Sequence, residues 1–404
     1  MTSNGSGTPN GSGTPNGSGT PKASSGTVTG AGAAVDLRQP GYVGAIASIS
    51  SDDVPALFEG AKFYSPAVGD ANKSSLTSWL MGLLDRNGPV SLRRPEAMAP
   101  DTPCISLCVI GSGSAMADLP PSGNEFSMAV QQIERISGTR FGAIYPLAAA
   151  TVSALAPVVA ASQLGLPLID ADGMGRTFAL IHHTAMYLAG VSLTPLVAQG
   201  PTGESVLLQT RAGPRADRLL RGNVDALGGW AALAAYSTTV GVLRRAALPG
   251  TMSRLINVGR VLLQYTDPDQ LVVRLAAIIG CRRIGRGRIV ELEHLSRPTD
   301  WTIPAHPSSL VLQEIDGLGR QFRIELRSEI VAVFADGELV AAAPDLLCLF
   351  DASRGVLATL DSLEPGDLVD VLATPADALW YSPEGMAMVG LGSHGIPLPH
   401  PRRR

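Results

Sequence analysis

Charge and cysteine are scarce in this sequence of 404 residues. Only 16% of the side chains are charged, and 31 basic against 35 acidic residues leave a formal net charge of −4, which argues against a general nucleic-acid binder. Four cysteines in so long a chain do not form a disulfide framework. The first residues lack a basic segment followed by an apolar one, so we expect no signal peptide and a cytoplasmic location.

One segment carries no charge at all. Residues 141–169 hold no Asp, Glu, Lys or Arg, and this is longer than the ~20 residues that cross a bilayer. However, Pro146, Pro157 and Pro167 interrupt the run. It is therefore interpreted as a buried strand–helix–strand unit, with the helix over residues 150–163, rather than as a membrane span.

Glycine and proline, by contrast, are abundant, with 45 and 30 copies, and are unevenly spread. The hexapeptide NGSGTP occurs three times in succession between residues 4 and 21, and Lys22 is the one charged residue of the first 34. Because such a segment has almost nothing to bury, we predict a disordered low-complexity tail over residues 1–34. At the other end, residues 396–404 finish in three arginines and are interpreted as a basic tail.

Between the tails, the order of strand and helix patterns predicts an α/β fold. Apolar strands alternate with helices up to about residue 200, which indicates a mostly parallel sheet with flanking helices. Helices are also expected over residues 178–188 and 218–247, and this α/β domain with its helical extension covers residues 35–280. Over residues 281–395, short alternating runs separated by Gly, Pro and Asp predict a smaller β-rich C-terminal domain, folded as a sandwich or barrel.

The most specific local signal is the sequence DADGMGR, directly after the apolar strand LPLI. Asp170 and Asp172 are two residues apart and share one face of a strand, at the sheet edge where open α/β folds bind ligands. Gly173 and Gly175 permit close approach to the backbone. Arg176 offers a guanidinium suited to a carboxylate or another planar anion. The pattern also fits acidic turn residues paired with the arginine, but a ligand site is the favoured interpretation.

Histidine is rare, with six residues, and two of them follow this motif. His182 and His183 fall on the helix expected there, where adjacent side chains point ~100° apart, so at most one faces the site. His183 is the candidate general base, because an unperturbed pKa of ~6.5 suits neutral pH. A metal held by the pair with one of the aspartates is left open, although no H-x-x-x-H or C-x-x-C spacing supports it. The remaining histidines are interpreted as turn, loop or tail residues: His294, His306, His394 and His400.

Two partial motifs carry less weight. Gly111 and Gly113 follow a strand, but Met116 stands where a dinucleotide fingerprint has its third glycine, so no nucleotide cofactor is expected. D-x-D-G after a strand is also similar to the first motif of haloacid-dehalogenase-type phosphatases. That motif opens its domain and continues with Thr, whereas here it lies in mid-sequence and continues with Met174.

Over most of its length the chain resembles the S-methyl-thiohydantoin desulfurase-like family, whose members are often encoded beside hydantoinases. The resemblance runs from about residue 35 to the C-terminus and depends on the order of several motifs. These are LPLIDADGMGRTF, GGWAALAAYSTTV, RRAALPGTMSR, GRIVELE, FADGELVAAAPDLLCLFD and MVGLGSHGIPLP. The resemblance implies an α/β N-terminal domain, a β-rich C-terminal domain and action on hydantoin-like five-membered rings.

The chain departs from the family pattern in several loops. Family members carry a glycine-rich loop where residues 65–70 read SPAVGD, and an acidic, Gly-Gly and Asn cluster where residues 145–151 read YPLAAAT. An Asn-Glu-Asn element appears here as RSE, which keeps its acid, Glu329. Asp70 and Glu329 are therefore the retained candidates for substrate binding in these loops.

Together these observations predict a divergent enzyme that acts on a small cyclic amide, thioamide or related metabolite, by hydrolysis. Asp170 and Asp172 would position or deprotonate the substrate or its attacking water. Arg176 would bind an anionic group, and His183 would carry protons. The binding site would be completed by Gly173, Gly175, Asp70 and Glu329. Two alternatives remain: a non-catalytic ligand-binding or partner subunit, and a biosynthetic cyclase or lyase that retained the pocket.

The expected partner is the small-molecule substrate, with no nucleic acid and no membrane. A homo-oligomer or a hydantoinase-type partner is left open. The cofactor is left unknown, with a divalent metal as the one candidate.

Overall fold

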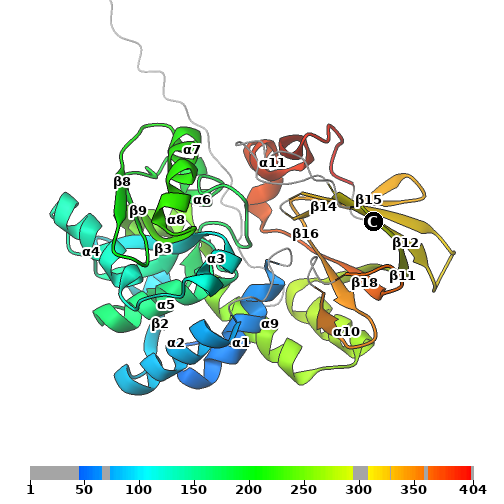
Figure 1. Ribbon diagram of the computed structural model, residues 1–404, viewed down its shortest axis with the longest axis horizontal. Coiled ribbons are helices and arrows are strands. Elements are labelled where there is room, and N and C mark those ends of the chain that lie inside the picture. The colour runs from blue at the N-terminus through cyan, green and yellow to red at the C-terminus, as the bar shows by residue number, and fades with distance from the viewer. Residues whose placement is uncertain (1–44, 66–72, 294–307, 328, 359–362, 402–404) are drawn as a thin grey trace, which may run out of the picture. The chain divides into compact units, whose positions relative to one another are not determined.

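The protein is described from a computed structural model (Figure 1) that covers residues 45–65, 73–293, 308–327, 329–358 and 363–401. The predicted tail over residues 1–34 and Asp70 lie outside this part of the chain. Within it, a sheet with a parallel centre and flanking helices is followed along the chain by an antiparallel β-rich part. The predicted α/β fold class with a β-rich C-terminal part is confirmed.

The first sheet has eight strands. In order across the sheet they are β1 (Ser48–Ile49), β2 (Val90–Arg93), β5 (Leu168–Ile169), β4 (Ala143–Pro146), β3 (Pro103–Gly111), β9 (Trp230–Thr239), β7 (Leu196–Gln199) and β8 (Ser205–Leu208). The four strands β2, β5, β4 and β3 run parallel, whereas β1 at one edge and β9, β7 and β8 at the other add antiparallel. The parallel centre follows from the strand–helix alternation, because parallel neighbours need a crossover helix.

Helices connect and cover these strands. The described α-helices are α1 (Val54–Phe63), α2 (Lys73–Asn87), α3 (Gly113–Asp118), α4 (Glu125–Ser137), α5 (Val152–Leu164), α6 (Ala185–Leu188), α7 (Gly213–Val224), α8 (Val240–Ala246), α9 (Thr251–Gln264), α10 (Pro268–Ile279) and α11 (Pro383–Val389). Helix α5 packs on β3 and β4, α4 packs on β7 and β9, and α1 lies against α9. Helix α9 carries part of the site described below.

The charge-free segment 141–169 forms the predicted strand–helix–strand unit, as β4, α5 and β5. Helix α5 is buried over most of its length and contains Pro157 in its interior. Among the described residues, no helix is long and apolar enough to cross a membrane.

Two predicted helices are wrong. Residues 178–188 consist largely of turns and bends, with only the short helix α6 at their end. Residues 218–247 contain the end of α7, the strand β9 and helix α8. Strand β9 lies between β3 and β7 and is buried over most of its length, so its alanine-rich sequence lacks the period-two alternation that separates a strand from a helix. Gly228 and Gly229, with φ of +91° and +83°, separate it from the preceding helical turn.

The second sheet is antiparallel throughout. Its order is β15 (Glu338–Ala342), β14 (Ile330–Ala335), β13 (Gln321–Leu326), β12 (Ser308–Glu314), β11 (Arg282–Glu293), β18 (Leu368–Thr374), β16 (Leu346–Asp351) and β17 (Val356–Leu357). The described strands form one sheet, not the two packed sheets of the predicted sandwich. Strand β14 also contacts β16, so the sheet curves back on itself without pairing its edge strands. The alternating sequence specifies which face is buried but not this curvature.

The two parts of the fold share a hydrophobic core. Cys348 and Phe350 of β16 belong to the same buried cluster as the side chains of α1, α5 and α9. The rings of Phe63 and Phe350 lie 6.2 Å apart. The opposite face of the second sheet has a smaller core of its own, centred on β12, β13 and β18. All four cysteines are buried and free, as the sequence predicts.

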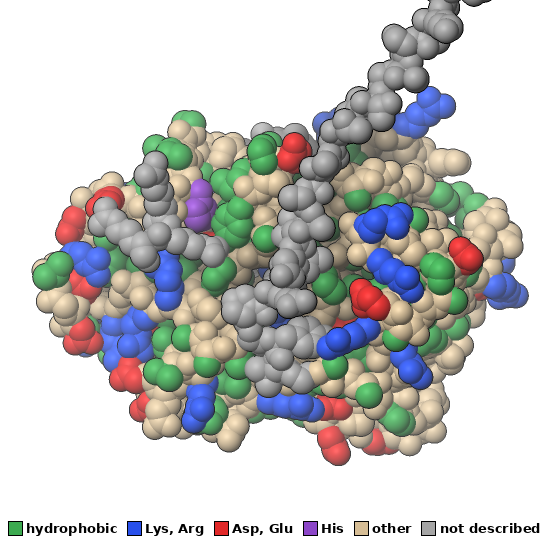
Figure 2. Space-filling model, turned by 180° about the vertical axis from the view of Figure 1, so that it is seen from behind, with side chains coloured by type: hydrophobic (Ala, Val, Ile, Leu, Met, Phe, Trp, Pro, Cys, Tyr) green, Lys and Arg blue, Asp and Glu red, His purple; other side chains and the backbone are tan. Residues whose placement is uncertain are grey.

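On the face of the molecule shown in Figure 2, Lys and Arg side chains lie interspersed with Asp and Glu side chains. This mixture agrees with the nearly balanced count of basic and acidic residues in the sequence.

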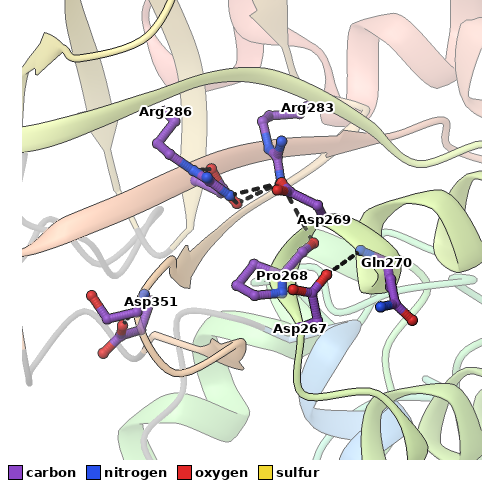
Figure 3. A network of polar contacts seen from close by, with 9 residues as sticks. Asp267, Pro268, Asp269, Gln270, Arg283, Arg286 and Asp351 are labelled. Carbon is purple, nitrogen blue, oxygen red and sulfur yellow. Dashed lines mark hydrogen bonds and ion pairs between the residues drawn. The ribbon is translucent and has the colours of Figure 1, made fainter.

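A network of four charged side chains attaches α10 to the second sheet (Figure 3). Asp370 of β18 is fully buried and accepts from Arg286 at 2.7 and 2.9 Å and pairs with Arg283 at 2.9 Å. Asp269 of α10 reaches the same two arginines at 3.0 and 2.7 Å but is 65% exposed. Arg283 and Arg286 therefore each pair with one buried carboxylate, Asp370, and one exposed carboxylate, Asp269.

We expect Asp370→Ala to lower the free energy of unfolding by about 3 kcal/mol, because it leaves two guanidinium groups partly buried without their carboxylate. Asp269→Ala is the matched control, and an exposed pair of this kind contributes less than about 1 kcal/mol. Urea unfolding followed by tryptophan fluorescence measures both. Equal losses for the two variants would contradict the assignment of the buried carboxylate as the stabilising one.

Candidate functional site

The segment Asp170–Arg176 begins where β5 of the first sheet ends. There the chain leaves the sheet, and β6 (Ala171–Asp172) pairs antiparallel with β10 (Leu248–Pro249), which leads into α9. The segment thus lies between the carboxyl edge of the parallel strands and the N-terminus of a helix. Both are places where folds of this class bind ligands.

Asp170 is buried and caps α9 from outside the helix. Its Oδ1 accepts hydrogen bonds from the backbone N–H groups of Met252 (2.9 Å) and Ser253 (3.1 Å), and its Oδ2 accepts one from Ser253 Oγ (2.6 Å). A carboxylate in this position satisfies N–H groups that have no partner within the helix, and it interacts favourably with the helix dipole. The side chain is therefore directed toward α9, away from the contacts that its neighbour Asp172 makes.

Asp172 is fully buried in a different environment. Its Oδ2 accepts hydrogen bonds from the N–H groups of Ala149 (2.6 Å) and Gly175 (3.0 Å), and its Oδ1 lies 2.9 Å from the latter nitrogen. Burial raises the pKa of Asp172 from the ordinary 3.8 to about 7, although these hydrogen bonds and the nearby Arg254 favour the charged form. A carboxyl group with a pKa near neutrality can take up and release a proton at physiological pH, as a general acid or base must.

The two glycines of the motif are required by protein packing. Gly175 has a φ of +74°, and a Cβ there would overlap the carboxylate of Asp377. A Cβ at Gly173 would lie 2.6 Å from the methyl group of Met186 and 3.0 Å from the carbonyl oxygen of Leu147. The predicted role of these glycines in binding a ligand stays a prediction, whereas their role in close packing is evident from these contacts.

An ion pair that sequence reasoning missed lies directly against Gly175. Arg254 of α9 donates from Nη1 and Nη2 to the two carboxylate oxygens of Asp377, which follows β18, with distances of 3.2 and 3.3 Å. Arg254 also donates to the carbonyl oxygen of Gly175 (3.0 Å), and its guanidinium lies 5.1 Å from the centre of the Tyr64 ring. Burial raises the pKa of Tyr64 to about 12. The partners are 123 residues apart in sequence, so no local pattern links them.

Arg176 and Glu329, two predicted binding residues, are brought together as a buried ion pair. The guanidinium also donates to the carbonyl oxygens of Pro344 (2.9 Å) and Asp345 (2.7 Å) and lies 5.2 Å from the centre of the Phe178 ring. Burial lowers the pKa of the guanidinium to about 10, which leaves it charged at neutral pH. Arg176 thus connects the motif to the turn between β15 and β16. Its Nε is buried and makes no hydrogen bond in the structure.

His182 and His183 lie in the turns that follow the motif, not on a helix. The N–H of Ala185 donates to the carbonyl oxygen of Gly173 (2.7 Å), so the chain returns to the motif directly after the two histidines. Their rings contact each other edge to face, with centroids 4.7 Å apart. The argument that at most one of them faces the site depended on a helix and does not apply.

Both histidines have lowered pKa values and are neutral at physiological pH. Burial, together with His182, His394 and Arg221, lowers the pKa of His183 to about 3. His394 was interpreted as a residue of an ordinary loop, yet its electrostatic influence reaches His183. Burial lowers its own pKa to about 4, and Arg176 adds to this effect. Its position within the motif SHGIPLP was the signal available in the sequence.

No group of three or more His, Cys, Asp or Glu side chains among the described residues is arranged to hold a metal ion. A site built from the two histidines with Asp170 or Asp172 is therefore not assembled in this conformation, and the identity of any cofactor stays open.

Two family models together match residues 52–401 of the sequence. A family model described as S-Me-THD-like, N-terminal domain, matches residues 52–210, and the model of the S-Me-THD-like C-terminal domain matches residues 211–401. The chain belongs to the S-Me-THD-like family. No protein with a curated description matches the sequence.

This S-Me-THD-like protein is similar to a solved structure, the X-ray crystal structure of a protein from Chromobacterium violaceum. The sequences are 21% identical, the match covers 88% of this chain and 99% of the other, and the TM-score is 0.73. At this identity the comparison establishes a common fold. The two family models meet between residues 210 and 211, before β9, so the C-terminal family domain contributes a strand to the first sheet.

The loop after β4, where the sequence departs from the S-Me-THD-like pattern, has an unusual backbone conformation at Thr151. Thr151, at the end of the loop after β4, has φ of 46° and ψ of −149°, a conformation that glycine adopts far more readily. The family carries a Gly-Gly pair in this loop. The same loop supplies the Ala149 N–H that holds Asp172, so the fold maintains this unfavourable backbone beside the buried carboxyl group.

The raised pKa of Asp172 predicts a pH-dependent stability. A carboxyl group with a pKa of about 7 in the folded state and an ordinary value of 3.8 in the unfolded state stabilises the fold at low pH. This stabilisation is lost as the pH rises toward 7. Relative to Asp172→Asn, the wild-type free energy of unfolding should therefore decrease between pH 5 and 7 and level off above. Urea unfolding at a series of pH values measures this difference, and parallel curves for the two proteins would contradict the prediction.

Proposed function

We propose that this S-Me-THD-like protein is an enzyme that hydrolyses a small cyclic amide or thioamide of the hydantoin type. One observation carries the proposal: Asp172, at the carboxyl edge of the sheet, is a buried carboxyl group with a pKa of about 7. The segment with the two neutral histidines is joined to the same motif by the hydrogen bond from Ala185 to Gly173. Groups with such shifted pKa values are typical of acid–base catalysis.

In the proposed reaction, the oxygen of a water molecule bonds to a ring carbon, and the proton of this water passes to the Asp172 carboxylate. The same proton then passes to the nitrogen or sulfur atom that leaves the carbon. Asp172 is the better base, because its pKa lies near neutrality whereas that of His183 is about 3. This assigns to His183 a different role from the proton carrier expected from the sequence. Its neutral ring supplies a hydrogen-bond acceptor for a ring N–H of the substrate.

Arg176 enters the proposal indirectly. Three of its contacts go to Glu329 and to two backbone carbonyl oxygens, so most of its donors already serve the protein. It holds the β15–β16 turn against the motif and places a positive charge near His394. Asp170, which caps α9, likewise supports the site from outside it.

A second function is favoured by the same contacts. Because Asp170 and Arg176 are engaged within the protein, a descendant that binds a hydantoin-like ligand without converting it would retain every contact described above. A biosynthetic cyclase or lyase is the third alternative carried over from the sequence. The cytoplasmic location and a homo-oligomer or hydantoinase-type partner stay predictions.

Turnover of a panel of hydantoins, thiohydantoins and S-methyl-thiohydantoins separates these functions. We expect Asp172→Asn to lower kcat by about 100-fold or more, as is typical for loss of a general base. His183→Gln should mainly raise KM. Asp118→Asn, on the exposed face of α3, is the control and should leave both constants unchanged. Binding of a ring compound by calorimetry without any turnover would support the non-catalytic alternative, and equal turnover by wild type and Asp172→Asn would remove Asp172 from the mechanism.

A further inference from the structure

Tyr236 has an unusual backbone conformation in the middle of a buried strand. Its φ is +48°, one of three positive values among the described residues other than glycine. The register of β9 against β3 shifts between Cys104 and Ser106, so an extra residue is inserted in β9 at this point. Such a β-bulge changes the direction in which a side chain points. A positive φ on a large side chain persists only where its surroundings require it, and such residues concentrate at functional sites.

The bulge directs the Tyr236 hydroxyl to both ends of the histidine pair. The hydroxyl donates to the carbonyl oxygen of Ile181 (3.1 Å) and accepts from Thr184 Oγ1 (3.1 Å). These are the residues immediately before His182 and immediately after His183. Tyr236 and Thr184 are both fully buried, so water does not compete for these hydrogen bonds.

Other contacts hold the bulge itself. Tyr145 of β4 donates from its hydroxyl to the carbonyl oxygen of Tyr236 (2.7 Å), and Ser106 Oγ donates to the carbonyl oxygen of Ala235 (2.8 Å). Side chains of β3 and β4 therefore hold the backbone from which the Tyr236 side chain extends. Thr184 is fixed in turn, because its Oγ1 accepts from the N–H of Tyr187 and caps α6.

We infer that Tyr236 is a positioning residue: through Ile181 and Thr184 it sets the place and the burial of the His182–His183 pair. This inference deepens the proposed function, on which its catalytic meaning rests. The ring of His183 contacts that of His182, and the charged forms of His394 and Arg221 also act on it. A fixed turn keeps the partly buried His183 near these groups, and this arrangement favours its neutral form.

The test uses the ring protons of the histidines, followed by NMR as a function of pH. In Tyr236→Phe, which removes only the hydroxyl, we expect the pKa of His183 to rise by at least one unit toward its ordinary value of ~6.5, because the freed turn lets water reach the ring. Tyr145→Phe is the matched control: it removes an equally buried hydroxyl from the same cluster but leaves both contacts to the turn. Because the Tyr145 hydroxyl helps to hold the bulge, its removal should shift the His183 titration by less than Tyr236→Phe does.

A second pair of variants covers the case in which Tyr236→Phe does not fold. Thr184→Val removes the other hydroxyl with little change of shape, and it should raise the pKa of His183 in the same direction. Thr184→Ser retains the hydroxyl and should restore the wild-type titration. Unchanged titration of His183 in both Tyr236→Phe and Thr184→Val, or an equal change in Tyr145→Phe, would overturn the inference.

Activity is measured separately, so that the two proposals fail independently. If the protein turns over a hydantoin-type ring, Tyr236→Phe should lower kcat by about tenfold or more through misplacement of the histidine pair, with a smaller effect in Tyr145→Phe. A moved titration without any turnover would refute the proposed function and uphold the positioning role. Turnover with an unmoved titration would do the reverse.

Discussion

The partly buried ion pair between Arg254 and Asp377 is the interaction on which the rest of the site depends. Taking two charges out of water is unfavourable unless their geometry is good and further hydrogen bonds are made, and here the paired guanidinium also donates to the Gly175 carbonyl oxygen and stacks on Tyr64. The pair occupies the space where a side chain at residue 175 would lie, so a glycine is needed there. Because its two charges act on Asp172 in opposite directions, burial dominates the pKa of that carboxyl group.

In the motif after β5, the first and last residues make structural contacts, and Asp172 between them is the candidate for chemistry. Asp170 holds the N-terminus of α9, and Arg176 holds the β15–β16 turn, so the two ends of the motif are anchored on different parts of the fold. Between them, Asp172 and the two glycines are packed without freedom to adjust. The segment that contains the histidine pair is joined to the motif by the hydrogen bond from the N–H of Ala185 to the carbonyl oxygen of Gly173. A rigid surrounding of this kind is what preorganised catalytic or binding groups require.

Much of this could be predicted from the sequence where the signal is local. The motif stood out because an apolar strand runs directly into acidic residues and glycines, and the strand–helix alternation predicted the α/β fold. Strand β9 was missed because a strand buried on both faces has no alternation, and its alanines fit a helix equally well. The pairing of Arg254 with Asp377, the position of His394 and the bulge at Tyr236 depend on contacts between distant segments. No spacing in one sequence reveals them.

Asp170 and Asp172 lie in different surroundings, and this difference bears on whether the motif has a function beyond packing. Both carboxyl groups are buried, and Asp170 accepts hydrogen bonds from Met252 and Ser253 at the N-terminus of α9. Asp172 lies where burial opposes its charge, and the neighbouring loop holds Thr151 in a conformation suited to glycine. Asp172 accepts hydrogen bonds from the backbone N–H groups of Ala149 and Gly175. The amide oxygen of an asparagine could accept the same hydrogen bonds without the cost of burying a charge. In the proposed function, the role of the Asp172 carboxyl group is to exchange a proton.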